Sequence, residues 1–234
     1  MKKYIPNSIT LANLFCGTIA VVLAVENRLD WAALFVGLGI FFDFFDGFFA
    51  RLLNVKSDLG LQLDSLADMV TAGVVPGIAM YQLLKGSTWV VENETTIAGF
   101  VPYIGFVITL ASAYRLANFN IDTRQTTGFI GLPTPANTLL ILSLPLILQY
   151  EPTEWMISIL QNVWVLIGIT LLSAYLLNAE IALFALKFKD YSLKNNGIKY
   201  LFLAVSAVLL ILLKISAIPI VILLYIALSL VTKR

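Results

Sequence analysis

The chain has 234 residues, of which 59% are hydrophobic and only 12% are charged, whereas a soluble domain usually carries about 25% charged residues. The 15 basic and 14 acidic residues almost balance, so the sequence carries no basic footprint for nucleic acid. It contains no histidine and one cysteine, Cys16. Histidine–metal sites, histidine general bases and intrachain disulfides are therefore excluded.

Apolar runs along the chain predict membrane-spanning helices. A spanning helix needs about 20 mostly apolar residues to cross a hydrocarbon core of about 30 Å. Eight segments meet this description, at roughly 9–25, 31–53, 60–84, 97–117, 134–150, 157–178, 198–213 and 217–231. The last two are short and could form a re-entrant hairpin instead. The expected fold is an all-α, polytopic membrane bundle that forms a single domain over residues 1–234.

The distribution of basic residues predicts the orientation of the bundle. If the N-terminus is cytoplasmic and eight segments alternate, the cytoplasmic side holds Lys2, Lys3, Arg51, Lys56, Arg115, Arg124, Lys187, Lys189, Lys194, Lys199, Lys233 and Arg234. The outer side then keeps only Arg28, Lys85 and Lys214. Cytoplasmic loops of membrane proteins are enriched in lysine and arginine. We therefore expect a multi-pass protein of the cell (inner or plasma) membrane with a cytoplasmic N-terminus.

Four aspartates lie at helical spacing where the second segment ends and the third begins. Residues spaced by three, four or seven positions share one face of a helix. One such stripe contains Asp43, Asp46, Gly47, Ala50 and Arg51, and the other contains Gly60, Asp64 and Asp68. The connection between the two segments is short, so they should be antiparallel neighbours. The four carboxylates are then expected to meet in the cytoplasmic half of the bilayer.

Such a cluster needs cations. One acid at the centre of a membrane costs roughly 2.5–3.5 kcal/mol on insertion scales, and four together also repel one another. Arg51 supplies one positive charge, and divalent cations are the simplest source of the rest. Ligands that are all oxygen favour Mg²⁺, Mn²⁺ or Ca²⁺ over zinc or copper. Two such ions about 3.5–4 Å apart would suit phosphoryl transfer. The small residues Gly47, Ala50 and Gly60 either allow close helix packing or form a slot for a nucleotide.

The same residues carry a family resemblance. The pattern D-x-x-D-G-x-x-A-R, eight residues, then G-x-x-x-D-x-x-x-D resembles the signature of the CDP-alcohol phosphotransferase family at every fixed position. The resemblance implies a six-helix core, about residues 5–195 here, with the hairpin at about 198–231 as an addition. Related enzymes are commonly homodimers, so it also implies a dimer.

The resemblance further implies roles for individual residues. Two divalent ions, Mg²⁺ or Mn²⁺ with Ca²⁺ as a further option, would be held by Asp43, Asp46, Asp64 and Asp68. Asp68 would also be the general base, and this is the catalytic role we expect. The CDP-lipid would be bound by Asn7, Thr10, Asp46, Gly47, Ala50, Arg51 and Gly60.

Flanking motifs resemble the phosphatidylserine synthase branch of that family. They are Ile5-Pro6-Asn7 with Thr10 and Asn13, Tyr114-Arg115-Leu-Ala-Asn118-Phe-Asn120, and Gly131-Leu-Pro-Thr-Pro-Ala. The branch transfers a phosphatidyl group from CDP-diacylglycerol (or CDP-archaeol) to L-serine and releases CMP. It often has arginine where this chain has Asn118, which weakens the case for serine. We expect serine contacts from Arg115, Asn118, Asn120 and Arg124.

Other functions stay open on the sequence alone. Glycerol-3-phosphate or an inositol-type alcohol could be the acceptor within the same family. Membrane prenyltransferases also use paired aspartate motifs, but place them far apart in the chain, whereas 17 residues separate Asp46 from Asp64 here. Intramembrane acids also occur in cation transporters, which tend to contain inverted repeats. This chain has all four acids in one hairpin.

Overall fold

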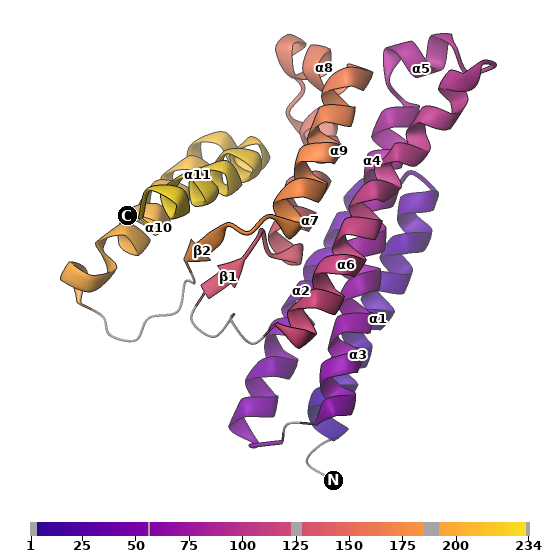
Figure 1. The fold of residues 1–234 in the computed structure, drawn as a ribbon. Helices are drawn as coiled ribbons and strands as arrows, with labels where there is room; N and C mark the ends of the chain where they lie inside the picture. The colour runs from indigo at the N-terminus through magenta and orange to yellow at the C-terminus, as the bar shows by residue number, and fades with distance from the viewer. Residues whose placement is uncertain (1–3, 56, 123–127, 185–191, 233–234) are drawn as a thin grey trace.

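The computed structural model describes residues 4–55, 57–122, 128–184 and 192–232, and these residues are almost entirely helical. Figure 1 shows long helices running side by side, with the N-terminus at one end of the bundle and α5 and α8 at the other. The helices are α1 (Tyr4–Val25), α2 (Leu29–Leu52), α3 (Asp58–Asp68), the π-helix η1 (Met69–Val74), α4 (Val75–Lys85), α5 (Thr88–Glu92), the 3₁₀ helix η2 (Ile97–Phe106), α6 (Val107–Ile121), α7 (Thr134–Tyr150), α8 (Glu154–Leu160), α9 (Val163–Asn178), α10 (Leu193–Leu213), the 3₁₀ turn η3 (Lys214–Ser216) and α11 (Ala217–Thr232).

Five described helical stretches are long and apolar enough to cross a membrane, and the bent pair α8–α9 raises the number to six. The protein is therefore a multi-pass, all-α membrane protein, as the sequence predicted. The count is lower than the eight segments expected from hydropathy. Helix α7 has the expected bounds, but its 17 residues extend only about 25 Å. Helices α10 and α11 replace the last two segments and are separated at Lys214, whose φ is 46°.

Helices α1 and α2 form a closely packed antiparallel pair. The chain reverses between them at Asn27, which adopts φ 59°, a conformation that asparagine tolerates better than most residues. Their contact includes small side chains that are fully buried, among them Ala20, Ala24 and Ala32. Small residues let helix backbones approach closely in a membrane. This packing places the start of α1 beside the end of α2, where two of the aspartates lie.

The third span, residues 58–85, changes its helical geometry in the middle. It begins as α3, widens into the π-helix η1 immediately after Asp68, and continues as α4. Hydroxyls from other helices bind carbonyls of the π-helix: Thr138 Oγ1 donates to Ala72 O at 2.8 Å, and Thr109 Oγ1 donates to Gly73 O at 3.0 Å. These bonds satisfy backbone groups that would be costly to leave unpaired in a membrane.

Two features were absent from the sequence-based expectations. Strands β1 (Gly128–Ile130) and β2 (Ala182–Phe184) pair antiparallel at one side of the bundle. Helices α8 and α9 meet at 68° across a short break, so the expected single segment at 157–178 is bent.

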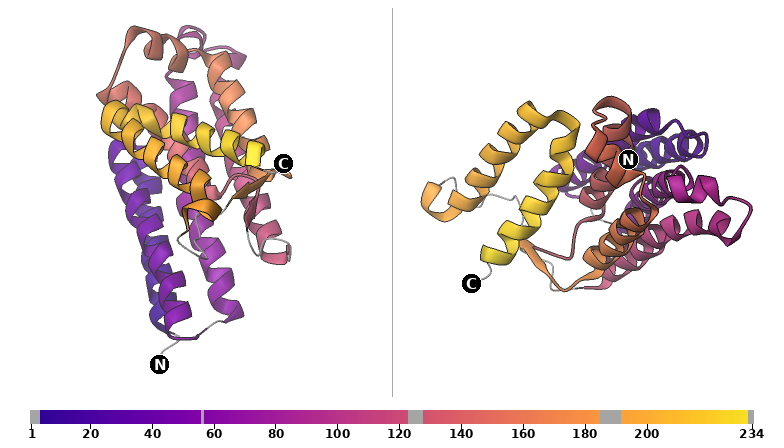
Figure 2. Two further views of the ribbon diagram at one scale, coloured as in Figure 1. Left: turned by 90° about the vertical axis from the view of Figure 1, so that its left-hand side faces the viewer. Right: turned by 90° about the horizontal axis from the view of Figure 1, so that it is seen from above.

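The α10–α11 hairpin lies to one side of the other helices (Figure 2). It packs on them through a small apolar cluster that includes Leu132, Leu176 and Ile222.

Candidate active site

The hairpin of α2 and α3 brings the aspartates together. Helix α3 begins after Ser57, whose Oγ accepts a hydrogen bond from Gly60 N at 3.0 Å, as an N-cap residue does. This start places Asp64 and Asp68 one turn apart on the same helix. Asp43, near the end of α2, faces them. One carboxylate oxygen from each of Asp43, Asp64 and Asp68 lies within 4.8 Å of the other two.

This three-carboxylate cluster fits a divalent cation. All its donor atoms are carboxylate oxygens, the ligands that Mg²⁺, Mn²⁺ and Ca²⁺ prefer. Oδ1 of Asp64 is buried and has no hydrogen-bond partner among the described residues. A buried acceptor without a partner costs free energy unless a cation or proton satisfies it. The cluster is therefore suited to holding one or more divalent ions, and its chemistry does not distinguish among these metals.

Asp46 has different surroundings from the other three aspartates. Its side chain is buried, and its Oδ2 accepts a hydrogen bond from Thr10 Oγ1 on α1 at 2.5 Å. It does not belong to the group of closely spaced carboxylates formed by the other three. It lies instead on the wall of a cavity next to the cluster. Its expected role as a fourth metal ligand stays a prediction.

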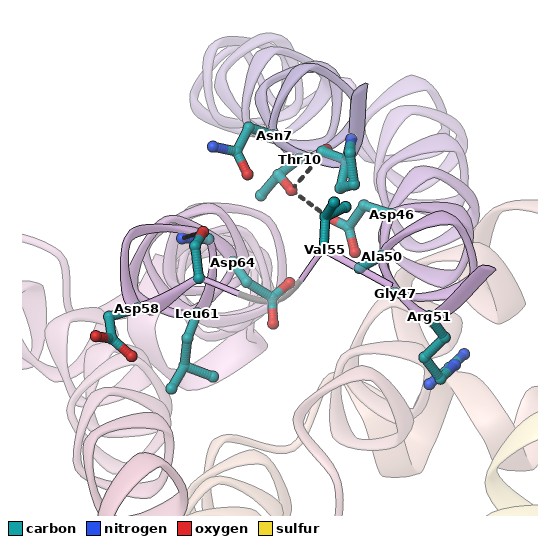
Figure 3. A pocket seen from close by; sticks show the side chains of 13 residues that line it. Asn7, Thr10, Asp46, Gly47, Ala50, Arg51, Val55, Asp58, Leu61 and Asp64 are labelled. Atoms are coloured by element: carbon teal, nitrogen blue, oxygen red, sulfur yellow. Dashed lines mark hydrogen bonds between the residues drawn. The ribbon is translucent and has the colours of Figure 1, made fainter. Parts of the chain in front are cut away.

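The cavity has a volume of about 540 Å³ and lies between α1, α2 and α3. Figure 3 shows Asn7 and Thr10 on one side, Asp46 to Arg51 on the second and Asp58 to Asp64 on the third. Every residue expected to bind the CDP-lipid lines it: Asn7, Thr10, Asp46, Gly47, Ala50, Arg51 and Gly60. Five residues that were not among the expected CDP-lipid contacts also line it: Pro6, Val55, Ser57, Asp58 and Leu61. Asp64 belongs both to this cavity and to the carboxylate cluster.

The two glycines of the cavity have different surroundings. A Cβ at Gly47 would meet only the Arg51 guanidinium, at 3.9 Å, so this position opens onto the cavity. A Cβ at Gly60 would lie 3.1 Å from Ser57 Oγ and 3.3 Å from Asn7 Oδ1, so this position is closely packed. Arg51 is exposed, and its side chain extends away from Asp46 and Thr10 (Figure 3). The space beside Gly47 and the exposed side chain of Arg51 favour a slot for a ligand over simple helix packing at this point.

The residues expected to bind serine lie in different places. Arg115 is buried, and its Nη1 donates to Ile130 O at 2.8 Å and to Leu177 O at 2.6 Å, which ties α6 to β1 and to the end of α9. Asn118 is exposed. Asn120 Nδ2 donates to Ser65 Oγ at 2.9 Å, beside Asp64, and its Oδ1 is buried and accepts no hydrogen bond from any residue that the structure describes. Arg124 lies outside the described residues. Of the described three, Asn120 is the one in direct contact with a neighbour of the aspartates.

Two further residues adjoin the aspartates and were not expected at the site: Asn13 contacts Asp68, and Thr71 contacts Asn13. Asn13 Nδ2 donates to Asp68 Oδ1 at 3.2 Å, and Thr71 Oγ1 donates to Asn13 Oδ1 at 2.9 Å. The polar interruption of the apolar α1 by Asn13 was a signal for the first of them. Thr71 carried no comparable signal, because the turn that directs it toward Asn13 is π-helical.

Comparison with known proteins relates these residues to a family. The family described as CDP-alcohol phosphatidyltransferase matches residues 3–175. A Bacillus subtilis protein named CDP-diacylglycerol–serine O-phosphatidyltransferase is 37% identical over 137 residues, which cover 57% of this chain and 70% of the relative. Proteins of the same name from Methanocaldococcus jannaschii and Saccharomyces cerevisiae are 32% and 34% identical, over 58% and 51% of their own lengths. The similarity thus spans between half and 70% of these relatives.

Proposed function

The chain belongs to the CDP-alcohol phosphatidyltransferase family, a family of transferases, and from this premise we propose that it transfers the phosphatidyl group of CDP-diacylglycerol to the hydroxyl of L-serine. The products are phosphatidylserine and CMP. The observation that carries the proposal is the position of Asp64, which lines the nucleotide-sized cavity and also belongs to the carboxylate cluster. A diphosphate in this cavity would lie against the cations that the cluster is suited to hold.

Divalent cations supply the electrostatic part of the chemistry when bound, because they neutralise charge on the diphosphate and on the departing CMP. We propose Mg²⁺ or Mn²⁺, held by Asp43, Asp64 and Asp68, with Asp46 as the fourth carboxylate by resemblance to the family. Ca²⁺ would fit the same oxygen ligands. The buried Oδ1 of Asp64 supports this set, since none of the described residues donates a hydrogen bond to it.

The protein's own groups bind the substrate and move a proton. The open wall at Gly47 and Ala50 accommodates the cytidine, while Asn7 and Gly60 form the opposite side. The serine oxygen attacks the phosphorus that carries the diacylglycerol, and the bond from that phosphorus to CMP breaks. Asp68 accepts the proton of the hydroxyl, because in a chain without histidine a positioned carboxylate is a suitable base.

The choice of serine as acceptor rests on the relatives and on one contact. The related proteins compared above carry a name that specifies serine. Asn120, which contacts Ser65 on α3, is the described residue best placed to bind serine. Its Oδ1 has no hydrogen-bond partner among the described residues and can accept from the ammonium group of serine. Arg115, Asn118 and Arg124 complete the proposed contacts. The guanidinium of an arginine would pair with the serine carboxylate.

The enzyme's place in the cell is also part of the proposal. The lysine and arginine distribution supports a cytoplasmic N-terminus and a cavity open to the cytoplasmic side of the cell membrane. By resemblance to the family, we propose that the chain forms a homodimer. Cysteine labelling tests the orientation. In a Cys16→Ala background, an impermeant maleimide should label Glu92→Cys in intact cells, and Tyr4→Cys only after the membrane is opened. The reverse pattern would overturn the orientation.

One assay tests the transfer reaction. Purified wild-type protein with CDP-diacylglycerol and Mg²⁺ or Mn²⁺ is expected to convert radiolabelled serine into lipid and to release CMP in equal amounts. Parallel reactions contain glycerol-3-phosphate or inositol as the sole acceptor, and a further reaction contains chelator. Faster CMP release with another acceptor would replace serine in the proposal. CMP release with no loss in chelator would remove the metals from it.

A further inference from the structure

We propose that Asn13 is a positioning residue for Asp68, and that Thr71 holds Asn13 in place through its hydroxyl. The inference deepens the proposed function and rests on it, because it concerns the aspartate assigned as general base and metal ligand. Asn13 does not line the cavity for the CDP-lipid, so its contact with the site is made through Asp68.

The contact has a defined direction. Asn13 Nδ2 donates to Asp68 Oδ1 at 3.2 Å, so this oxygen is engaged by α1 while the other stays available to a cation or a substrate hydroxyl. A hydrogen bond from a neutral amide holds the orientation of the carboxylate without adding a charge. Metal-ligating carboxylates are commonly held in this way by neighbouring hydrogen-bond donors.

Thr71 determines which way the Asn13 amide points. Thr71 Oγ1 donates to Asn13 Oδ1 at 2.9 Å, which leaves the Nδ2 group of Asn13 facing Asp68. Both residues are buried: Asn13 is 0% exposed and Thr71 is 1% exposed. The hydrogen bond from Thr71 to Asn13 is therefore fully buried, where such bonds are stronger than in water, and the bond from Asn13 to Asp68 is partly buried.

Close packing restricts both side chains to this arrangement. A Cβ added at Gly39 on α2 would lie 2.7 Å from Thr71 Cγ2 and 2.8 Å from Asn13 Oδ1. A Cβ at Gly17 on α1 would collide with Thr71 Oγ1. The π-helix that begins after Asp68 brings Thr71 between these two glycines. Single-turn π-helices are frequent at functional sites.

A buried asparagine could also serve helix packing alone, and the two roles predict different results. Asn13→Ala is expected to lower kcat about 10- to 100-fold, the range seen when the hydrogen-bond partner of a metal ligand is lost. The KM for the CDP-lipid should change little. Binding of Mn²⁺ without substrate should weaken as well, and this weakening should disappear in an Asp68→Asn background. A packing role would change thermal stability and leave kcat and the Mn²⁺ dissociation constant as they are.

Milder variants keep the test valid if Asn13→Ala does not fold. Thr71→Val removes the hydroxyl at nearly constant volume and should lower kcat, whereas Thr71→Ser should recover much of it. Gly39→Ala should displace the Asn13 amide and lower kcat. Gly37→Ala is the matched control on the same helix, because a Cβ there has no neighbour within 4 Å.

Three outcomes would overturn the inference: wild-type kcat and Mn²⁺ affinity in folded Asn13→Ala, equal impairment in Thr71→Ser and Thr71→Val, or the same loss of Mn²⁺ affinity in the Asp68→Asn background. Failure of the proposed function is separate. In that case the wild-type protein would not incorporate serine, while the Mn²⁺ measurements would still decide the role of Asn13.

Discussion

At the scale of single residues, the four aspartates of one sequence motif have different partners. Asp46 accepts from Thr10, Asp68 accepts from Asn13, and Asp64 has a buried oxygen to which no described residue donates a hydrogen bond. Spacing along a helix could predict that they share a face, and three of them do meet. It could not predict the partners, because these come from α1, more than 30 residues earlier in the chain.

Asp68→Asn tests the general-base role. The amide has nearly the same volume as the carboxylate but cannot accept the proton of the serine hydroxyl. We expect turnover to fall about 10²- to 10⁴-fold, the usual contribution of a general base. Binding of the CDP-lipid should persist, as measured by equilibrium binding in detergent. Asp30→Asn, at the opposite end of α2, is the control. Normal CMP release by Asp68→Asn would remove the base assignment.

Arg115→Ala tests whether this arginine has a structural role. Its Nη1 binds the carbonyls of Ile130 and Leu177, and hydrogen bonds from charged groups are each worth about 1.5–3 kcal/mol. Truncation leaves two carbonyls without this donor, so the midpoint of thermal unfolding in detergent should fall by several degrees. Arg115→Lys should recover part of the loss.

The kinetics of Arg115→Ala then separate this role from serine binding. A rise in the KM for serine alone, with an unchanged unfolding midpoint, would contradict the structural role. A lower midpoint together with similar changes in both KM values would contradict direct serine binding by Arg115.

At the scale of elements, the sequence predicted most helices and missed the interruptions. The range 134–150 agrees with α7 to the residue, and 31–53 agrees with α2 within two residues. Hydropathy defines such ranges because a helix that crosses a membrane is apolar along most of its length. The bend at α8–α9 lies at Asn162, whose side chain caps α9. The π-helix and the β1–β2 pair depend on partners elsewhere, such as the Thr138 hydroxyl on Ala72 O. No local pattern in the sequence encodes those partners.

The turn between α10 and α11 is hydrogen-bonded to one acidic side chain from another part of the chain. Glu151 follows α7, and its carboxylate accepts from the main-chain N–H groups of Ile215 at 3.0 Å and Ser216 at 2.9 Å. The Ser216 hydroxyl donates to the same carboxylate at 2.5 Å. These donors precede α11, so Glu151 acts as a cap for that helix from outside it. The hairpin is thereby attached to the rest of the bundle at this end.

The pKa of Glu151 gives this attachment a pH dependence. Partial burial raises the pKa, but the hydrogen bonds from Ser216 and from the Ile215 and Ser216 amides, together with Lys214, outweigh it and hold the pKa below its usual value. A depressed pKa means that the folded state favours the anion. The stabilisation is therefore complete above the pKa of the unfolded chain and is lost as the pH falls through the folded-state pKa.

Glu151→Gln tests the attachment. Hydrogen exchange of the Ile215 and Ser216 amides should be faster in this variant than in the wild type at neutral pH, because the charged acceptor is gone. When corrected for intrinsic exchange rates, wild-type protection should fall toward that of the variant in acid, below about pH 4.5. Glu154→Gln, an exposed acid on α8, is the control. Equal protection in wild type and Glu151→Gln at neutral pH would contradict the capping role.

At the scale of the whole molecule, the carboxylate cluster should link stability to cation binding. Asp43, Asp64 and Asp68 come from two helices that pack against the rest of the core, so repulsion among them opposes the folded state. A cation that binds only the folded state stabilises it by an amount that grows with its concentration, about 2.7 kcal/mol at 100 times the dissociation constant. Whether a mutation at the cluster stabilises or destabilises the folded state should therefore depend on whether metal is present.

Asp64→Asn is the variant that tests this linkage, because the buried Oδ1 of Asp64 accepts no hydrogen bond from the part of the chain that the structure describes. In chelator, the substitution removes one of three neighbouring negative charges and should raise the unfolding midpoint above that of the wild type. With saturating Mn²⁺, the wild type should gain stability and the variant should gain much less, so the order of the two midpoints reverses. Asp30→Asn should respond to Mn²⁺ as the wild type does. If Mn²⁺ stabilises Asp64→Asn as much as the wild type, the cluster does not hold the ion, and the proposed chemistry loses its source of positive charge.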